Sequence, residues 1–216
     1  MQIEIWSDVV CPWCYVGKRR FERALEQFEG RDGVSIVHRS FQLDPTRPLS
    51  QTHNRRQMLM SKYRLSAEQV SAMDTQMEGL AAAEGLEYHL GPDGVTGNTR
   101  QAHELVHLAR AAGLADAVIE RFYRAYFTEG RSVFDVDSLV ALAQEAGLDE
   151  ASCRRVLAEG TYTAAVEAEG GQARQFGAGG VPFFVIDQRF GVSGAQSTDV
   201  FLDALRRAAA TAQARA

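Results

Sequence analysis

The sequence has few cysteines, three among 216 residues, and no apolar run long enough to span a membrane. Three cysteines cannot form the disulfide framework of a small secreted domain. The first residues also lack the basic and apolar segments of a signal peptide. We therefore expect a cytoplasmic protein with free thiols and no membrane partner.

Basic residues are in the minority, with 23 Lys and Arg against 28 Asp and Glu, a formal net charge of -5. A nucleic-acid binder that works by counterion release needs a dominant basic face, so we expect no nucleic-acid partner. The proportions of hydrophobic and charged residues, 45% and 24%, are those of an ordinary globular protein. The length allows one large domain, or a small domain that carries a second lobe.

The N-terminal part carries the patterns of a strand, a helix and a second strand. Residues 2–7 alternate between polar and apolar side chains, which is the period of a strand. A helical pattern then runs from Cys11 to a stop signal at Gly30, and residues 34–43 form the next predicted strand.

The C-terminal part also contains predicted strands. The continuous apolar run over residues 181–186 has the length of a buried strand, and residues 189–193 are its predicted partner. A last helix is expected to begin at Ser197 or Thr198.

The middle of the chain, residues 54–176, contains amphipathic segments with helix caps and no convincing strand. Ser66 and Gln69 fit a capping box, and Gly113 and Gly147 close two apolar stripes of helical period. We therefore predict an all-helical block, with its last helix over residues 161–176.

These elements predict an α/β protein with a split domain. The segment between the second and third strands is far longer than the roughly dozen residues that a parallel crossover requires. We place a large inserted all-helical domain at residues 49–160, within a domain formed by residues 1–48 and 161–216.

The sequence Cys11-Pro12-Trp13-Cys14 lies where the first strand gives way to the first helix. With Cys11 as N-cap, Pro12 takes the first helical position, which proline tolerates well. The free N–H groups of Trp13 and Cys14 can then point at the Cys11 sulfur, and the helix dipole favours a thiolate there. Cys11 is the predicted nucleophile. Cys14, one turn deeper, would resolve a mixed disulfide.

Two other interpretations of the cysteines stay open. Two cysteines at this spacing also form half of a zinc site, but no second such pair completes it, and the pair could equally be inert. Cys153 is most simply a buried apolar residue, with a third redox thiol as the alternative. We predict no metal site.

The motif, together with Val181-Pro182 at the start of a late strand, resembles the thioredoxin superfamily and its DsbA-like branch. The stretches at residues 7–15, 98–103 and 193–196 are most similar to FrnE-type DsbA proteins. The resemblance implies a thioredoxin-like fold with an inserted helical domain. It also implies a cis peptide bond before Pro182, facing the cysteines, although a trans proline that begins a buried strand remains the alternative.

Several residues are predicted to bind substrate or to position it. The predicted catalytic residues are Cys11, Cys14 and Pro182. Pro12 and Trp13, which lie between the two cysteines, are predicted to bind substrate. A cis turn would expose the backbone N–H and C=O of Val181 to an extended substrate, which could pair with them as an added strand.

The segment His103-Glu104-Leu105-Val106-His107 matches a zinc-protease pattern on a predicted helix. No further ligand follows at the spacing of such proteases, and the cysteine motif would be left unexplained. We therefore expect half-buried helix residues here, and place Asn98 and His103 among the substrate-binding residues.

Charged residues close to the cysteines are the remaining candidates. Asp8 is a candidate proton acceptor for Cys14, with an ordinary loop carboxylate as the alternative. The three basic residues that follow on the helix, Lys18, Arg19 and Arg20, are expected to face solvent.

The sequence thus predicts a cytoplasmic thiol–disulfide oxidoreductase or isomerase that acts on disulfide- or thiol-bearing proteins or small molecules. It needs no cofactor beyond its own redox-active disulfide, and glutathione is a candidate co-substrate. The alternative is a glutathione-dependent isomerase or transferase, of the 2-hydroxychromene-2-carboxylate isomerase or kappa-transferase type, in polyketide metabolism. A third interpretation is a protein-binding module or holdase. The sequence indicates neither the redox direction nor the oligomeric state.

Overall fold

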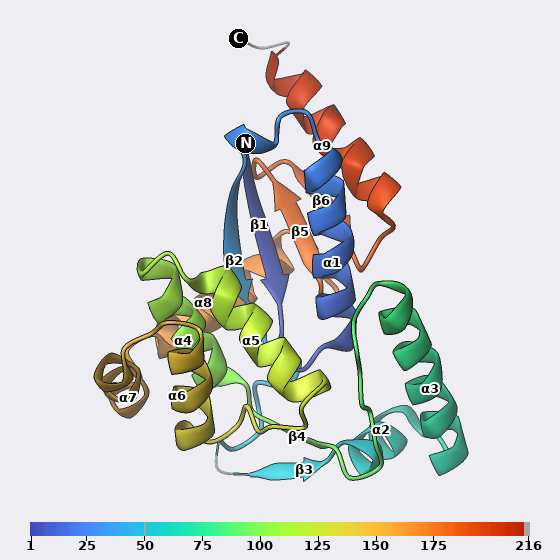
Figure 1. Cartoon of the computed structure of the whole chain (residues 1–216), viewed down its shortest axis with the longest axis vertical. Helices are drawn as coiled ribbons and strands as arrows, with labels where there is room; N and C mark the ends of the chain where they lie inside the picture. The colour runs from blue at the N-terminus through green and yellow to red at the C-terminus, as the bar shows by residue number, and fades with distance from the viewer. Residues whose placement is uncertain (50, 214–216) are drawn as a thin grey trace. The chain divides into compact units, whose positions relative to one another are not determined.

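The computed structural model describes residues 1–49 and 51–213 (Figure 1). The chain divides into two compact units, one formed by residues 1–43 and 165–216 and the other by residues 44–164. The boundaries predicted from sequence follow residues 48 and 160, five residues after the first of these positions and four before the second. Among the described residues, none of the helices combines the length and apolarity needed to cross a bilayer.

The first unit is built on a four-stranded sheet in the order β2-β1-β5-β6. Strand β1 (Gln2–Ser7) pairs in parallel with β2 (Ser35–Ser40) and antiparallel with β5 (Phe183–Ile186), which pairs antiparallel with β6 (Phe190–Ser193). Strand β2 is shorter than the predicted residues 34–43, because its partner β1 ends at Ser7, opposite Ser40.

Helices cover both faces of this sheet. Helices α1 (Pro12–Gln27) and α9 (Thr198–Gln213) lie side by side on one face (Figure 1). Helix α8 (Thr163–Gln175) supplies residues to the other face. The core between the sheet and the α1–α9 pair is formed by Ile3, Ile5, Phe21, Ala24, Phe28, Phe184, Ile186, Phe201, Leu205 and Ala208. On the opposite face, Trp6, Phe183 and Val185 pack against Ala173 and Ala178.

The second unit is mostly helical. Its helices are α2 (Arg55–Tyr63), α3 (Ala67–Ala83), α4 (Arg100–Ala111), α5 (Ala115–Phe127), α6 (Val136–Glu145) and α7 (Glu150–Glu159). The capping box of Ser66 and Gln69 is present at the start of α3. The thioredoxin-like fold with a large helical insertion is thus the observed architecture.

The prediction that this insertion is all-helical was wrong in one place. Strands β3 (Thr52–Asn54) and β4 (Val95–Gly97) form a small antiparallel sheet. Each strand has only three residues, too few to show an alternating pattern in the sequence. Their pairing joins segments far apart in the chain, so no local signal announces it.

Candidate active site

The cysteine motif begins helix α1 as the sequence predicts. Cys11 is the N-cap, with extended backbone angles (φ -89°, ψ 111°), and Pro12 is the first helical residue. The Cys11 N–H donates to the Asp8 carbonyl at 3.0 Å, and the Cys14 N–H donates to the Cys11 carbonyl at 3.0 Å. The loop from β1 is therefore fixed to the first turn of α1, and both sulfurs lie at its N-terminal end.

Cys11 lies beside the backbone of the strand that begins with proline. Its Sγ is 3.5 Å from the Val181 carbonyl oxygen, to which the thiol donates. The peptide bond between Val181 and Pro182 is cis, as the resemblance implies. These contacts place Cys11, Val181 and Pro182 together in one site.

The expectation that helix N–H groups point at the Cys11 sulfur was wrong for this arrangement of the thiols. No hydrogen bond from the first turn of α1 reaches the Cys11 side chain. The Cys11 sulfur is turned toward Val181, and it accepts a hydrogen bond from the Cys14 thiol instead. The helix dipole acts on the sulfur without a hydrogen bond from the helix backbone.

Cys14 is buried and favours its protonated form. Burial raises the pKa of the Cys14 thiol well above its usual value, and its hydrogen bond to Cys11 raises it further. A negative charge on Cys11 or on Asp8 also raises the pKa of Cys14, while a backbone hydrogen bond from Asp8 lowers it. These surroundings disfavour a thiolate at Cys14.

Asp8 is one of the most deeply buried charged residues of the first unit, with 1% of its surface exposed. Its Oδ2 accepts the Leu43 N–H at 2.7 Å, which ties the loop after β1 to the segment after β2. Its charge acts on the Cys14 thiol. The structure therefore places this carboxylate within electrostatic range of the cysteine pair.

The residues between the cysteines differ in exposure. Trp13 is 44% exposed, and Pro12 is partly buried. An exposed aromatic ring next to a buried cysteine offers apolar area to a binding partner. Their substrate-binding role remains a prediction.

Asn98 and His103 belong to the helical unit, and their role toward substrate also remains a prediction. Asn98 donates to the Arg47 carbonyl at 2.6 Å and accepts the Arg100 N–H at 2.8 Å. It therefore fixes the loop near Arg47 to the start of α4. His103 is buried on α4.

The side chains of the zinc-protease pattern make contacts within the helical unit. The ring of His107 stacks on Tyr162 at 5.3 Å, and its Nδ1 accepts a hydrogen bond from Arg110 at 2.8 Å. Glu104 accepts a hydrogen bond from Thr163 at 2.6 Å. Within residues 1–49 and 51–213, no three His, Cys, Asp or Glu side chains are grouped as metal ligands would be.

Cys153 is fully buried on α7. Burial raises the pKa of its thiol, and the charges of Asp149 and Glu150 add to the effect. These surroundings disfavour the thiolate, as expected for a buried apolar-like cysteine.

The expectation that the basic residues after Cys14 face solvent was wrong for Lys18. Lys18 is buried and forms an ion pair with Glu22. Arg20 is partly exposed, but it also donates to the Ala195 carbonyl at 2.7 Å. The local sequence gives no sign of the Arg20 contact, because Ala195 lies far along the chain.

A family model, the DSBA-like thioredoxin domain, matches residues 2–206. The probable DsbA oxidoreductase of Streptomyces coelicolor is 50% identical, with a TM-score of 0.92 over 96% of this chain and 89% of that chain. Two structures of lower identity share the fold alone and cover all of both chains. They are a 2-hydroxychromene-2-carboxylate isomerase (16% identity, TM-score 0.70) and the cytosolic disulfide reductase DsbM of Pseudomonas aeruginosa (18%, 0.66). With the paired cysteines at the start of α1, these matches show that the chain belongs to the DsbA-like family of thiol–disulfide oxidoreductases.

Proposed function

We propose that the protein is a thiol–disulfide oxidoreductase or isomerase that uses Cys11 and Cys14 on protein or small-molecule disulfides. The observation that carries the proposal is the contact of the Cys11 thiol with both the Cys14 thiol and the Val181 carbonyl in a chain of this family. The cytoplasm is the compartment we propose.

In the first step Cys11 attacks as a thiolate. The Cys11 sulfur forms a bond to one substrate sulfur while the substrate disulfide breaks, and the second substrate sulfur leaves as a thiolate that takes up a proton. The positive end of α1 and the Cys14 S–H both stabilise negative charge on the Cys11 sulfur. An extended substrate segment would pair with the Val181 backbone, and Trp13 would cover its side chains.

In the second step Cys14 resolves the mixed disulfide. The Cys14 thiol gives up its proton, its sulfur bonds to Cys11, and the bond between Cys11 and the substrate breaks. The substrate gains two electrons and is released as a thiol, and the protein keeps the Cys11–Cys14 disulfide. We propose Asp8 as the base that takes the proton, directly or through water. Run in reverse, the same steps oxidise a dithiol.

Insulin reduction and reactivation of scrambled ribonuclease test this function. We expect activity from the wild type, none from Cys11→Ser, and full activity from the matched control Cys153→Ser. A Cys11→Ser variant that retains full activity in both assays would overturn the proposal.

A glutathione-dependent isomerase is the second candidate, because the fold is shared with 2-hydroxychromene-2-carboxylate isomerase. The resemblance implies serine at the position of Cys11 in those isomerases, so the cysteine pair favours redox chemistry here. A glutathione-dependent isomerisation assay on the same variants distinguishes the two. Activity in that assay alone would support the isomerase and make glutathione a co-substrate.

A further inference from the structure

The loop over residues 194–196 is attached to both the active-site strand and helix α1. The Gly194 N–H donates to the Pro182 carbonyl at 2.8 Å. One residue later, the Ala195 carbonyl accepts a hydrogen bond from Arg20 at 2.7 Å. The loop therefore links Arg20 to Pro182 through two consecutive residues.

Helix α1 also touches Pro182 directly, at Gly17. A Cβ added to Gly17 would lie 2.9 Å from the Pro182 Cγ and 3.4 Å from the Ala195 Cβ. The first of these distances is shorter than any ordinary carbon contact, so the proline ring approaches the helix only because position 17 has no side chain. A glycine in the interior of a helix lowers the stability of the helix. The close contact with Pro182 is a physical reason for having glycine at position 17.

These contacts hold Val181 in place relative to Cys11. The Val181 carbonyl contacts the Cys11 sulfur. The next residue, Pro182, accepts a hydrogen bond from the Gly194 N–H, and its ring packs against Gly17. Helix α1 begins directly after Cys11 and carries both Gly17 and Arg20. One rigid helix thus positions the nucleophile and the loop that supports the opposing backbone.

We propose that Arg20 is a positioning residue for this active site. Its guanidinium fixes the 194–196 loop, which keeps the Val181 backbone at the distance from Cys11 that an extended substrate requires. The proposal rests on the proposed function for its effect on turnover, but the attachment of the loop can be measured without any substrate. An arginine suits the position because a charged donor makes a stronger bond to a carbonyl than a neutral one does.

The variant Arg20→Met removes the donors and keeps most of the side-chain length. Amide hydrogen exchange followed by NMR reports on the Gly194 N–H. We expect Gly194 to exchange about tenfold faster in Arg20→Met, because the hydrogen bond that holds the loop is lost. Arg20→Lys, which keeps one charged donor, should restore most of the protection.

The matched control is Arg206→Met, which removes an arginine that pairs with Glu29 in the same unit. It should leave Gly194 exchange unchanged. Equal acceleration in Arg206→Met and Arg20→Met, or unchanged exchange in Arg20→Met, would overturn the proposal.

Turnover supplies the second readout. In Arg20→Met we expect kcat/KM on a protein disulfide to fall about tenfold, because displacing a group that aligns the substrate slows the reaction. Alkylation of Cys11 by iodoacetamide, which needs no backbone pairing, should change by less than about twofold. Equal losses in both reactions would mean that Arg20 acts on the sulfur itself, against the proposal. An inactive wild type would instead refute the proposed function and leave the exchange test standing.

The variant Gly17→Ala tests the same positioning and leaves Arg20 unchanged. The added methyl group must push Pro182 away, so we expect the same selective loss on the protein disulfide. Full activity of a folded Gly17→Ala variant on that substrate would contradict the proposed positioning.

Discussion

Two arginine-centred ion-pair networks, one in each unit, differ in how deeply their carboxylates are buried. In the unit that holds the cysteines, Arg39 bonds to the buried carboxylates Glu4 and Glu169 at 2.6 Å and 2.7 Å. In the helical unit, Arg121 pairs with Glu129 and Glu145, and both carboxylates remain accessible to solvent.

The helical unit also contains a buried pair, Asp74 with Arg55, so the difference belongs to these two networks. The buried charges of the first unit join elements far apart in the sequence: Glu4 lies on β1, Arg39 on β2 and Glu169 on α8. In the helical unit, Asp135 and Asp149 supply local signals, because their side chains cap the starts of α6 and α7. The network around Arg39 therefore fixes long-range geometry in the first unit, while α6 and α7 of the second unit begin at local caps.

The largest expected effect comes from Arg39→Met. The substitution leaves two buried carboxylates without their cation, and we expect it to lower the free energy of unfolding by about 3–5 kcal/mol. The matched change in the helical unit, Arg121→Met, should cost less than about 1 kcal/mol, because its ion pairs are screened by water. Urea unfolding followed by circular dichroism measures both. Equal losses would refute the contrast between the two networks.

The next prediction concerns Asp8→Asn, which keeps an acceptor for the Leu43 N–H but removes the charge. If Asp8 takes the proton of Cys14, resolution of the mixed disulfide should slow by about a hundredfold near neutral pH. The loss of the negative charge should also lower the pKa of Cys14, and so move the pH dependence of resolution to lower pH.

Stopped-flow measurement of the two steps distinguishes these effects. Formation of the mixed disulfide should be little changed, because the charge of Asp8 is assigned to the second step. An Asp8→Asn variant that resolves as fast as the wild type would leave Asp8 a purely structural carboxylate.

A smaller effect is expected for the reactivity of the buried thiols in the two units. In Cys11→Ser, burial still raises the pKa of Cys14, and burial also raises the pKa of Cys153. Both should react with iodoacetamide at pH 8 at least about tenfold more slowly than the same thiols in unfolded protein. Peptide mass mapping after timed alkylation measures each site. Rapid labelling of Cys14 in the folded variant would contradict its assignment as a buried resolving thiol.

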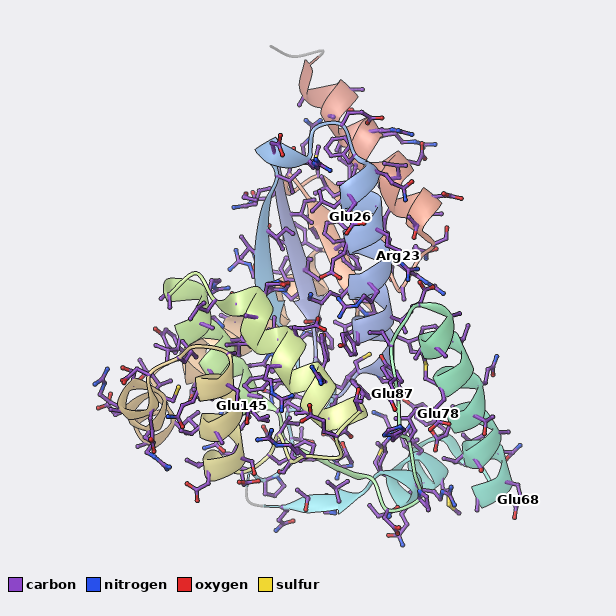
Figure 2. All side chains as sticks on the ribbon, in the orientation of Figure 1. Arg23, Glu26, Glu68, Glu78, Glu87 and Glu145 are labelled. Atoms are coloured by element: carbon purple, nitrogen blue, oxygen red, sulfur yellow. The ribbon has the colours of Figure 1, made fainter. Side chains whose placement is uncertain are left out.

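The smallest expected effect is the acid response of the helical unit. Hydrogen bonds from Arg131 and Arg121 lower the pKa of Glu145 to about 2. Glu145 is labelled at the end of α6 in Figure 2. A lowered folded pKa stabilises the protein above the unfolded value, about 4.3, and the contribution is lost as the pH falls toward 2.

Because Glu145 is exposed, this contribution should be less than about 1 kcal/mol and should shrink in high salt. Glu145→Gln should abolish it. Unfolding curves at pH 5 and pH 3 for the two proteins provide the measurement, and an identical acid response in both would contradict the assignment to Glu145.

Much of the fold could be predicted from local sequence signals. Periodicity predicts two strands, because residues 2–7 alternate in β1 and a continuous apolar run forms β5. Hydrogen bonding by the capping residues predicts the start of α3. The pair β3–β4 could not be predicted, because three-residue strands have no readable period and their pairing is long-range.

The sequence predicted the cysteine pair and the proline of the site but not the contacts that support them. A cysteine pair at the junction of a strand and a helix predicts a nucleophile at Cys11, and the resemblance supplied the cis proline. The contact of Arg20 with Ala195 and the burial of Lys18 depend on tertiary packing. The one local clue was Gly17, since a glycine in a helix interior suggests that another chain segment comes close.

The most direct test of the central claim is trapping of the mixed disulfide in Cys14→Ser. Without the resolving thiol, the bond between Cys11 and a protein substrate should persist, and a non-reducing gel with peptide mass mapping should find the substrate joined at Cys11. The account predicts one substrate per protein at that residue. No covalent complex, or a complex joined at Cys153, would contradict it.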